Sequence, residues 1–575
     1  MLSDLTFFII QYCKDSAVLF HQKTEINSCH TQVRADNHPR NCDESRSDNM
    51  LCFFLKNSTQ FLLDKFIEFL LSFTFHISNY CDKFSEFKCG TLNFDPAVCP
   101  ILRNSLSLLS FFRINDPFRL IAILVIMLLM STIYIWFVDI PLLQPEMIWM
   151  LLGERMADGK HMYIDIIDDS GPLSAGVFWV AHLIFGKSAL AHKALAAFIV
   201  LFQVVYVNYL FIRYKSFEDN TYIPAFVMAL LFYVSFDLVT LSPALMGSTF
   251  IVLALGQLFS QTVLQKEGSD AVLLVGIFGG IAACFHFPLA TFLPFLLVSG
   301  IVVSGFSFQQ IIVSLIAYAM PLVFCALYYF WIDGFEAFFY EFIIAPRLIE
   351  SYAHVRYRDL ALLFALPLFL SVMGFFVGFI FKSQTVNQQK QLQLNLIFSI
   401  FAVSSLLLTN RRTPYQFIVI LPALTYFISL LLVVYKKGIA IQILTAFFVI
   451  GIPATGITWT LLQINSGKIE SYAVSFEEKH EVTKGKQILV LGEDMGYYQN
   501  ATLATPYLHF RLSKNVLLDQ EDLGNTVKVY ENFLKERPEI IIDEEGVFAR
   551  LLERIPVLSQ QYEKRGTSYF LKKIN

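Results

Sequence analysis

Six carboxylates lie within the stretch 141–173, PLLQPEMIWMLLGERMADGKHMYIDIIDDSGPL, in a chain of which only 16% of residues are charged. They are Glu146, Glu154, Asp158, Asp165, Asp168 and Asp169. The stretch directly follows the first long apolar segment, and carboxylates are costly to place inside a bilayer. A positioned carboxylate can take a proton from an attacking group. The cluster therefore predicts acid–base chemistry at a membrane face.

Glu146 is the leading candidate for the base, because it follows the first apolar segment and begins the run EMIWMLLGERMADG. The run predicts a short helix lying on the bilayer, and Glu154 could share a face with Glu146. The alternative for Glu146 is a favourable interaction with the helix dipole. Asp169 or Ser170 is expected to cap a helix that begins at Pro172.

Cationic and aromatic candidates lie in two other regions. The segment NRRTPYQFIVILPAL (410–424) holds Arg411 and Arg412, and neighbouring guanidiniums suit a phosphate because each can make bidentate bonds. Tyr415 could stack on a sugar ring or anchor the chain at the membrane interface. His286, in the turn CFHFP, could contact a phosphate or serve the structure alone.

Apolar helices must position these residues, because hydrophobic residues make up 55% of the 575-residue chain. Apolar runs of roughly 15–25 residues recur through the middle, long enough to cross a hydrocarbon core about 30 Å thick. A β-barrel would show short alternating segments instead. The net charge of −4 gives no reason to expect a nucleic-acid partner. We therefore predict an all-α polytopic membrane protein.

We predict eleven membrane spans: 117–137, 189–212, 222–236, 243–264, 271–286, 288–304, 309–331, 359–381, 393–409, 415–435 and 438–462. The positive-inside rule places Arg113 and Arg119, before the first span, in the cytoplasm. The basic clusters near 213–215, 266, 382–390 and 436–437 fall on the same side only if 172–186 does not cross the membrane. That segment is therefore predicted to be a half-helix at the outer face.

Some basic residues are predicted to lie outside, against this bias: Lys160, Arg347, Arg356, Arg358, Arg411 and Arg412. A bound anion would explain them, and solvated loop charge paired with nearby Asp and Glu is the alternative. The external loop 332–358 is expected to be an interfacial lid or a packing helix. Asp237, in the turn 236–243, could reach the same cavity or cap a helix.

Residues 1–110 differ from the rest of the chain. They contain no convincing span or secretory signal, and they hold seven of the nine cysteines, without the spacing of a zinc site. We expect either a poorly structured extension or sequence upstream of the native start. We favour the second, because FFRINDPFR (111–119) places basic residues just before a span. The transmembrane domain is then 111–465.

Residues 466–575 are predicted to form a small α/β domain. Strands are expected at 486–495, 539–544 and 567–574, with helices at 522–538 and 547–555. The odd number of spans places this domain outside the cytoplasm. The segment ILVLGED has no GxGxxG pattern, so nucleotide binding is not indicated. A structural or substrate-covering role is expected instead.

Chemistry at the outer face depends on lipid-linked donors, because nucleotide-activated sugars are not available there. Transfer of a sugar from a polyprenyl phosphate needs a base for the acceptor hydroxyl, cationic groups for the leaving phosphate and an apolar groove for the lipid. The sequence offers candidates for all three on one side of the membrane.

These features in this order resemble the GT-C glycosyltransferases, in particular the family 39 type of protein mannosyltransferases and aminoarabinose transferase-like enzymes. The resemblance rests on GxxMYxDxxDxxGPL (159–173), LIFGKSALAHK (183–193) and RRTPYQ…LPAL, with an acidic residue after the first span. It covers about 110–575. It implies an inverting transfer of a hexose or pentose at the non-cytoplasmic face, in the bacterial plasma membrane.

The family carries its catalytic acid, usually Asp, in the first external loop. By position this chain offers Glu146, and the departure leaves Asp165 or Asp168 as alternatives. Where the family has a pair of prolines, this chain has Gly171-Pro172. Where the family has a basic residue directly before that pair, this chain has Ser170. Contact with the donor phosphate is therefore expected from elsewhere.

The expected phosphate and substrate contacts are Lys160, His286, Arg411, Arg412 and Tyr415. No cofactor is expected and no cluster of metal ligands stands out, although a divalent cation could bind at the acidic loop. The acceptor would be a lipid, a glycan or a protein. One rival class is a lipid or polysaccharide transporter. Transporters often contain internal repeats, and no clear repeat is found in this sequence. The other rival class is an assembly subunit whose external domain binds partners.

Overall fold

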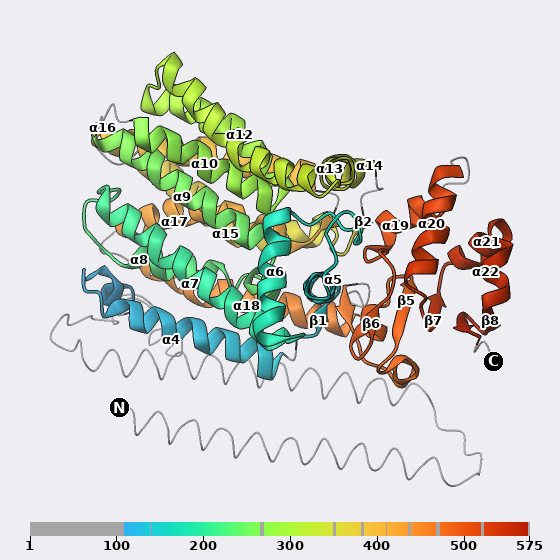
Figure 1. The fold of residues 1–575 in the computed structure, drawn as a ribbon. Coiled ribbons are helices and arrows are strands. Elements are labelled where there is room, and N and C mark those ends of the chain that lie inside the picture. Colours follow the sequence, from blue (N-terminus) through green and yellow to red (C-terminus); the bar gives the residue numbers. More distant parts are fainter. Residues whose placement is uncertain are drawn as a thin grey trace, which may run out of the picture. The chain divides into compact units, whose positions relative to one another are not determined.

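The computed structural model describes residues 108–138, 140–264, 269–348, 352–380, 384–409, 411–434, 439–466, 472–518 and 523–572. The expected N-terminal extension at 1–110 lies almost entirely outside the described residues. Within them, long helices come first along the chain, and a five-stranded sheet with its own helices follows (Figure 1).

In the described part of the chain, nine helical segments are long and apolar enough to cross a membrane. They are α4 with η2 (Arg119–Phe137), α7 (Ala189–Arg213), α9 (Pro243–Leu264), η4 to η5 with α11 (Phe287–Ser304), α12 (Phe308–Trp331), α15 (Tyr357–Ile380), α16 with η7 (Val386–Leu408), η8 with α17 (Pro414–Val434) and α18 (Ile439–Asn465). Each matches a predicted span, so the prediction of an all-α polytopic membrane protein is confirmed.

Two further predicted spans form shorter helices. The first, α8 (Ile223–Leu231), has nine residues, all of them buried, so its apolar sequence serves the interior of the bundle. The second, α10 (Ser269–Phe285), packs closely on α12, because a Cβ at Gly276 would lie 2.3 Å from the carbonyl oxygen of Ser314. Small residues let helices approach this closely in membranes.

Helix α17 (Leu421–Val434) lies at the core of the bundle, since every one of its residues except Val434 is buried. Its neighbour α15 approaches through Gly374, where a Cβ would lie 2.0 Å from the carbonyl oxygen of Phe427. The C-terminal end of α16 and the beginning of η8 (Pro414–Ile420) meet near this core. This junction is where one wall of the candidate site forms.

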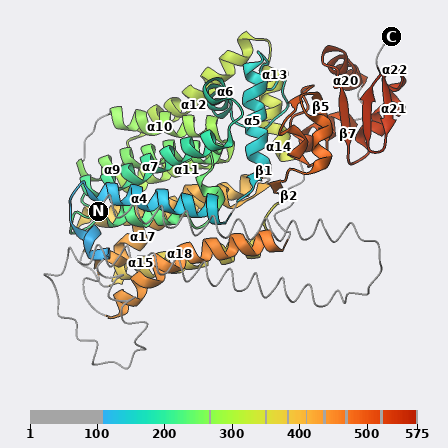
Figure 2. The same ribbon diagram turned by 90° about the horizontal axis from the view of Figure 1, so that it is seen from below.

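Two short helices follow the first span, α5 (Gln144–Ala157) and α6 (Pro172–Phe185). Helix α5 begins with Pro145 in its first turn and ends before Gly159, which has φ +80°. Figures 1 and 2 show both helices running across the direction of the long helices. This is the orientation expected for helices at a membrane face, and the apolar α6 is too short to count among the candidate spans.

The C-terminal region holds a sheet in the order β6-β5-β7-β9-β8. Its strands are β5 (Gln487–Leu491), β6 (Thr502–Leu503), β7 (Ile540–Asp543), β8 (Tyr562–Arg565) and β9 (Ser568–Leu571), and its helices are α19 (Phe510–Leu518), α20 (Leu523–Lys535), α21 (Val547–Arg554) and α22 (Pro556–Gln561). Strands β6, β5 and β7 run parallel, and β9 and β8 are antiparallel to their neighbours. The predicted strands and helices of a small α/β region are therefore present.

Two pairs of short strands join distant loops. Strand β1 (Leu142–Leu143) pairs antiparallel with β4 (Ala473–Val474), so the chain after the first span meets the chain after the last one. Strand β2 (Tyr352–Ala353) pairs in parallel with β3 (Arg411–Arg412). Both pairs bring together the loops that surround the candidate site.

Candidate functional site

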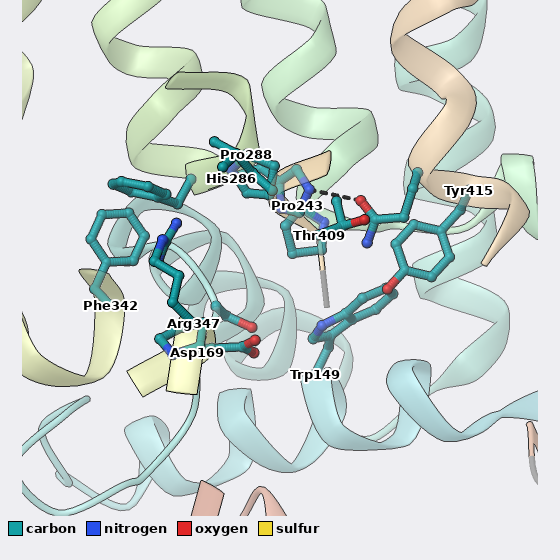
Figure 3. A pocket seen from close by; sticks show the side chains of 14 residues that line it. Trp149, Asp169, Pro243, His286, Pro288, Phe342, Arg347, Thr409 and Tyr415 are labelled. Carbon is teal, nitrogen blue, oxygen red and sulfur yellow. Dashed lines mark hydrogen bonds between the residues drawn. The ribbon is translucent and has the colours of Figure 1, made fainter. Parts of the chain in front are cut away.

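A pocket lies where the ends of several helices meet the loop 163–171, and it encloses about 570 Å³ together with its open mouth. Its lining residues are Trp149, Asp169, Ser170, Pro243, His286, Phe287, Pro288, Phe342, Pro346, Arg347, Leu408, Thr409, Tyr415 and Gln416. Figure 3 shows Asp169 and Arg347 on one side and Trp149 with Tyr415 on the other. A carboxylate, a guanidinium, an imidazole and an aromatic wall thus share one cavity.

The loop 163–171 closes on itself and presents Asp169 to the pocket. Tyr163 has φ +68°, and its hydroxyl donates to the carbonyl of Ser170 at 2.6 Å. The backbone N–H of Ser170 donates to Oδ2 of Asp168 at 3.1 Å, and Asp168 is fully buried. Asp168 and Ser170, on either side of Asp169, are held by hydrogen bonds within the loop, whereas the side chain of Asp169 lines the pocket.

Gly171 seats this loop against the end of α10. A Cβ there would lie 2.2 Å from the carbonyl oxygen of Cys284 and 2.3 Å from that of Phe285. The hydroxyl of Ser174 donates to the same carbonyl of Phe285 at 2.8 Å. Gly171 is also the N-cap of α6, with no side-chain cap, so the expectation that Asp169 or Ser170 caps this helix is wrong.

Gly171→Ala is expected to displace the loop, because the added methyl group meets backbone atoms that cannot move aside. Overpacking of this kind typically costs about 1–3 kcal/mol or more. We expect a lower thermal-denaturation midpoint in detergent. The matched control is Gly176→Ala in the same helix, where a Cβ has nothing within 4 Å. Equal midpoints for the two variants would contradict this reading.

Arg347 comes from the loop 332–358. It lies in α14 (Ala345–Leu348), directly after the π-helical turn η6 (Phe339–Ile344), and such turns recur at functional sites. Its guanidinium donates to the carbonyl of Ile343 and lies over the ring of Phe287, 4.1 Å from the centroid. Partial burial lowers the pKa of Arg347, while the charge of Asp169 acts in the opposite direction.

Glu341, on the same π-helical turn, is a second carboxyl group near Asp169. It is buried, and its Oε2 has no hydrogen-bond partner among the residues that the structure describes. Burial, and then the charges of Asp168 and Asp169, raise the pKa of Glu341 to about 7. Glu341 therefore holds its proton up to about neutral pH, which limits the negative charge beside Asp169.

His286 and Gln416 form the polar floor between the two sides. The imidazole Nε2 of His286 and the amide Oε1 of Gln416 are 2.8 Å apart (Figure 3). An amide oxygen only accepts, so Nε2 of His286 carries the proton in this bond. The contact joins the end of α10 to η8, which are 130 residues apart along the sequence.

Trp149 and Tyr415 form the aromatic wall. Their ring centroids are 5.7 Å apart in an edge-to-face arrangement, and Trp149 stacks on Phe178 of α6, also at 5.7 Å. The indole N–H of Trp149 is buried and has no hydrogen-bond partner within the described residues. A buried unsatisfied donor beside a cavity is available to a ligand. Aromatic faces with a polar handle suit a sugar ring.

Asp237 positions Tyr415 from behind the wall. The turn η3 (Phe236–Val239) buries it fully, and its Oδ2 accepts from the backbone N–H of Tyr415 at 3.1 Å and the hydroxyl of Tyr472 at 3.0 Å. Its Oδ1 accepts from Ser235 at 2.6 Å. Burial raises the pKa of Asp237 to about 6, against the effect of these hydrogen bonds. Asp237 thus affects the cavity indirectly, through Tyr415.

Asp237 predicts a pH-dependent stability. A folded-state pKa of about 6 exceeds the ordinary aspartate value of 3.8, so the folded protein binds more protons between these values and loses stability as the pH rises through that window. Relative to Asp237→Asn, which does not titrate, the wild type should lose about 2 kcal/mol of stability between pH 4.5 and 6.5. Denaturation midpoints of both proteins across this range measure the difference. A constant difference would contradict the prediction.

Two of the predicted site residues, His286 and Tyr415, line the pocket. The three predicted carboxylates, Glu146, Asp165 and Asp168, are not among the lining residues. Glu146 is 3% exposed and accepts a hydrogen bond from the N–H of Leu143 at 3.0 Å. This is the arrangement of a carboxylate at a helix start, and burial raises the pKa of Glu146. Its role as the base stays a prediction.

The remaining two carboxylates stabilise the loop. Asp165 accepts from the backbone N–H of His161 at 3.0 Å, which closes a turn. Asp168 is buried and accepts from Ser170. Their positions within three or four residues of Asp169 explain why a sequence argument selected this loop and a neighbouring carboxylate.

Lys160 and Arg412, two of the basic residues predicted to contact phosphate, are not among the described lining residues. Lys160 forms an ion pair with Glu536 of the C-terminal region. The guanidinium of Arg412 lies 4.3 Å from the ring centroid of Tyr357. The backbone of Arg411 pairs with Tyr352 in β2 and β3, and its side chain lies outside the described part.

The sequence argument did not single out Asp169, Trp149, Gln416 or Glu341 for the site. Asp169 was predicted only as a member of the acidic cluster and as a possible helix cap, and no role was predicted for Trp149. A signal for Arg347 was present, because it was among the basic residues predicted against the charge bias. In the described ranges, no group of three or more His, Cys, Asp or Glu side chains could hold a metal ion.

No known family model matches the chain, and no curated protein matches its sequence. The apolar helical bundle, the crosswise helices after the first span and the small C-terminal sheet together have the GT-C glycosyltransferase fold. The particular likeness is to ArnT from Cupriavidus metallidurans, in a crystal structure with bound undecaprenyl phosphate. The TM-score is 0.51 and the identity 11%, over 78% of this chain and 97% of that one.

Two further solved structures are similar at lower scores. ArnT from Cupriavidus metallidurans in the apo state has a TM-score of 0.48 and 11% identity, over 78% of this chain and 97% of that chain. An oligosaccharyltransferase from Archaeoglobus fulgidus in the apo form has a TM-score of 0.42 and 12% identity, over 78% and 73%. The likeness to the ligand-bound ArnT confirms the GT-C fold that the sequence resemblance implied, for a chain that is an integral membrane protein.

Proposed function

We propose that this protein transfers a sugar from a polyprenyl-phosphate donor to a hydroxyl group of a lipid, glycan or protein acceptor at the outer face of a membrane. The observation that carries the proposal is the pocket itself, which combines Asp169, Arg347 and the Trp149–Tyr415 wall. The structural likeness to an ArnT that was solved with undecaprenyl phosphate supports a donor of this class.

The proposed reaction is a single displacement with inversion. The carboxylate of Asp169 takes the proton of the acceptor hydroxyl as its oxygen attacks the anomeric carbon. The bond between that carbon and the phosphate oxygen breaks, and the electron pair leaves with the polyprenyl phosphate. The guanidinium of Arg347 faces the same cavity and is suited to stabilise the growing negative charge.

The aromatic wall is proposed to hold the sugar ring. Tyr415 and Trp149 present large, firmly packed surfaces, and the indole N–H of Trp149 offers a donor to a sugar hydroxyl. The lipid chain would lie along exposed apolar side chains of the bundle, of which Phe330 and Trp331 at the end of α12 are 70% and 87% exposed. No cofactor enters this proposal.

Glu146 is retained as the rival base, because its position after the first span is the one that the family resemblance implies. Its buried carboxyl group lies at the start of α5, the helix that also carries Trp149. We further propose that the pocket and the C-terminal region lie outside the cytoplasm, in a bacterial plasma membrane. The distribution of basic residues along the sequence supports this orientation.

The test is turnover by the purified chain in proteoliposomes. A panel of polyprenyl-phosphate-linked hexoses and pentoses would be supplied with envelope extract as the acceptor source, and release of free polyprenyl phosphate would be measured. We expect release with at least one donor, together with an inverted glycosidic product. Movement of the intact lipid between leaflets without bond cleavage would reject the enzyme and favour the transporter.

A further inference from the structure

We propose that Glu536, in the C-terminal region, is a positioning residue for Asp169 and acts through a strained turn at Thr505. The inference rests on the proposed function insofar as it concerns turnover. It assigns the C-terminal region a part in shaping the active site, beyond covering a substrate. Pro506 and His509 of this region bind the backbone of Ile167 in the loop that carries the base, and Glu536 binds the turn at Thr505 directly before them.

Glu536 is the centre of a compact charged cluster. Its Oε2 accepts from the guanidinium of Arg155 at 2.5 Å and from the backbone N–H of Thr505 at 2.8 Å, and its Oε1 pairs with the ammonium of Lys160. Burial would raise the pKa of Glu536, but the bond from Lys160, the charge of Arg155 and the N–H of Thr505 bring the pKa below its usual value. Glu536 is therefore an anion at neutral pH.

Thr505 has a backbone conformation that its side chain disfavours. Its φ is +77°, in the left-handed region, where a β-branched residue is a clear outlier. Strain of this kind costs about 1–3 kcal/mol and persists only where surrounding contacts impose it. The hydroxyl of Thr505 is buried with no partner in the part of the chain that the structure describes. The side-chain contact made directly by Thr505 is therefore its N–H bond to Glu536, while Ala504 and Pro506 on either side bond to Ile488 and Ile167.

Directly after the turn, the chain makes two backbone hydrogen bonds to the loop that carries Asp169. The carbonyl of Pro506 accepts from the N–H of Ile167 at 2.7 Å, and the N–H of His509 donates to the carbonyl of Ile167 at 3.1 Å. Ile167 is bound on both sides of its backbone, two residues before Asp169. A shift of the turn at Thr505 would therefore shift the backbone that presents Asp169.

The cluster links two parts of the stretch 141–173 through the C-terminal region. Glu536 binds Arg155 and Lys160, and the turn that it holds binds Ile167. Arg155 and Lys160 lie at and just after the end of α5, in the same acidic stretch that ends in Asp169. Arg155 also donates to the carbonyl of Leu503 at 3.2 Å, two residues before Thr505, and so supports the same turn. Lys187 binds Glu154 and the carbonyls of Tyr498 and Ala501, which fixes α5 without touching Ile167. Glu536 is thus placed to set the position of Asp169 specifically.

The test compares Glu536→Gln with Glu531→Gln, an exposed carboxylate on helix α20, which ends directly before Glu536. Both variants are made in the full chain and reconstituted in liposomes. Loss of a charged hydrogen bond that holds a strained turn is expected to lower kcat about 10-fold, with KM for the polyprenyl-phosphate sugar unchanged. Deuterium uptake by peptides covering 163–170 should rise at the same time, and neither change is expected in Glu531→Gln.

A second substitution separates positioning from general stabilisation. Glycine adopts φ +77° without strain, so Thr505→Gly in the Glu536→Gln background should recover most of kcat and the slow deuterium uptake. Failure of the double variant to recover kcat and the slow deuterium uptake would overturn the proposal. So would unchanged uptake at 163–170 in Glu536→Gln.

The deuterium measurement needs no turnover. Rapid exchange in Glu536→Gln with no detectable transfer in the wild type would therefore reject the proposed function and leave the positioning contact standing. Transfer by the wild type, with kcat unaffected in Glu536→Gln, would support the proposed function and reject the positioning role of Glu536.

Discussion

Asp169→Asn is expected to lower kcat for sugar transfer by about 10²–10⁴-fold, the usual contribution of a general base. The amide keeps the shape of the side chain and removes its ability to take a proton. KM for the donor should change little, because Asp169 is proposed to contact the acceptor hydroxyl. Release of polyprenyl phosphate in the proteoliposome assay measures the loss.

The matched control for this variant is Asp165→Asn in the same loop. Its Oδ2 accepts a backbone hydrogen bond from His161, which an amide oxygen can also accept, so we expect near-normal turnover. Glu146→Gln is the third arm and must first be shown to fold. Loss of turnover in Glu146→Gln with normal turnover in Asp169→Asn would move the base to Glu146.

Arg347→Ala is expected to lower kcat/KM by about 10²–10³-fold, the typical effect of removing one group that stabilises charge in the transition state. Binding of polyprenyl phosphate itself should weaken as well, because the leaving group carries the negative charge that Arg347 faces. Arg347→Lys should recover only part of the loss, since an ammonium keeps the charge without the bidentate geometry of the guanidinium.

The control for Arg347 is Arg412→Ala. The guanidinium of Arg412 lies over the ring of Tyr357 and does not line the pocket, so its loss should change donor binding little. Titration of reconstituted protein with polyprenyl phosphate compares the two variants directly. An equal or larger loss of binding in Arg412→Ala would restore the phosphate role that the sequence indicated for the arginine pair.

The elements of this fold could largely be predicted because they depend on local signals. The length of the apolar runs identified the spans. The hydrophobic periodicity typical of strands and of helices identified β5, α20, β7, α21 and β9 close to where they lie. The two short cases, α8 and α10, show the limit of that signal. A run such as 222–236 is apolar because it is buried among other helices, and hydropathy does not distinguish protein from lipid as its surroundings.

The site could be predicted only in part, because tertiary packing assembles it. His286 and Tyr415 were identified, but the bond from His286 to Gln416 spans 130 residues of sequence. Asp169 looked like a cap because its neighbours Ser170 and Gly171 form a turn, and the contact that leaves Gly171 as the cap is with the distant end of α10. Glu146 was close in sequence, and its burial is a property of the folded protein.

The seating of Gly171 on α10 also has an electrostatic consequence. The carbonyl oxygens of Cys284 and Phe285 end α10, and they meet the first turn of α6, where Ser174 donates to Phe285. The negative end of one helix dipole therefore faces the positive end of another, and the two partly cancel. A helix N-terminus is often an anion site. The N-terminus of α6 at Pro172, however, already faces the carbonyl oxygens of Cys284 and Phe285. An anionic leaving group in this pocket therefore depends on a side-chain cation, and among the described lining residues Arg347 carries a permanent positive charge.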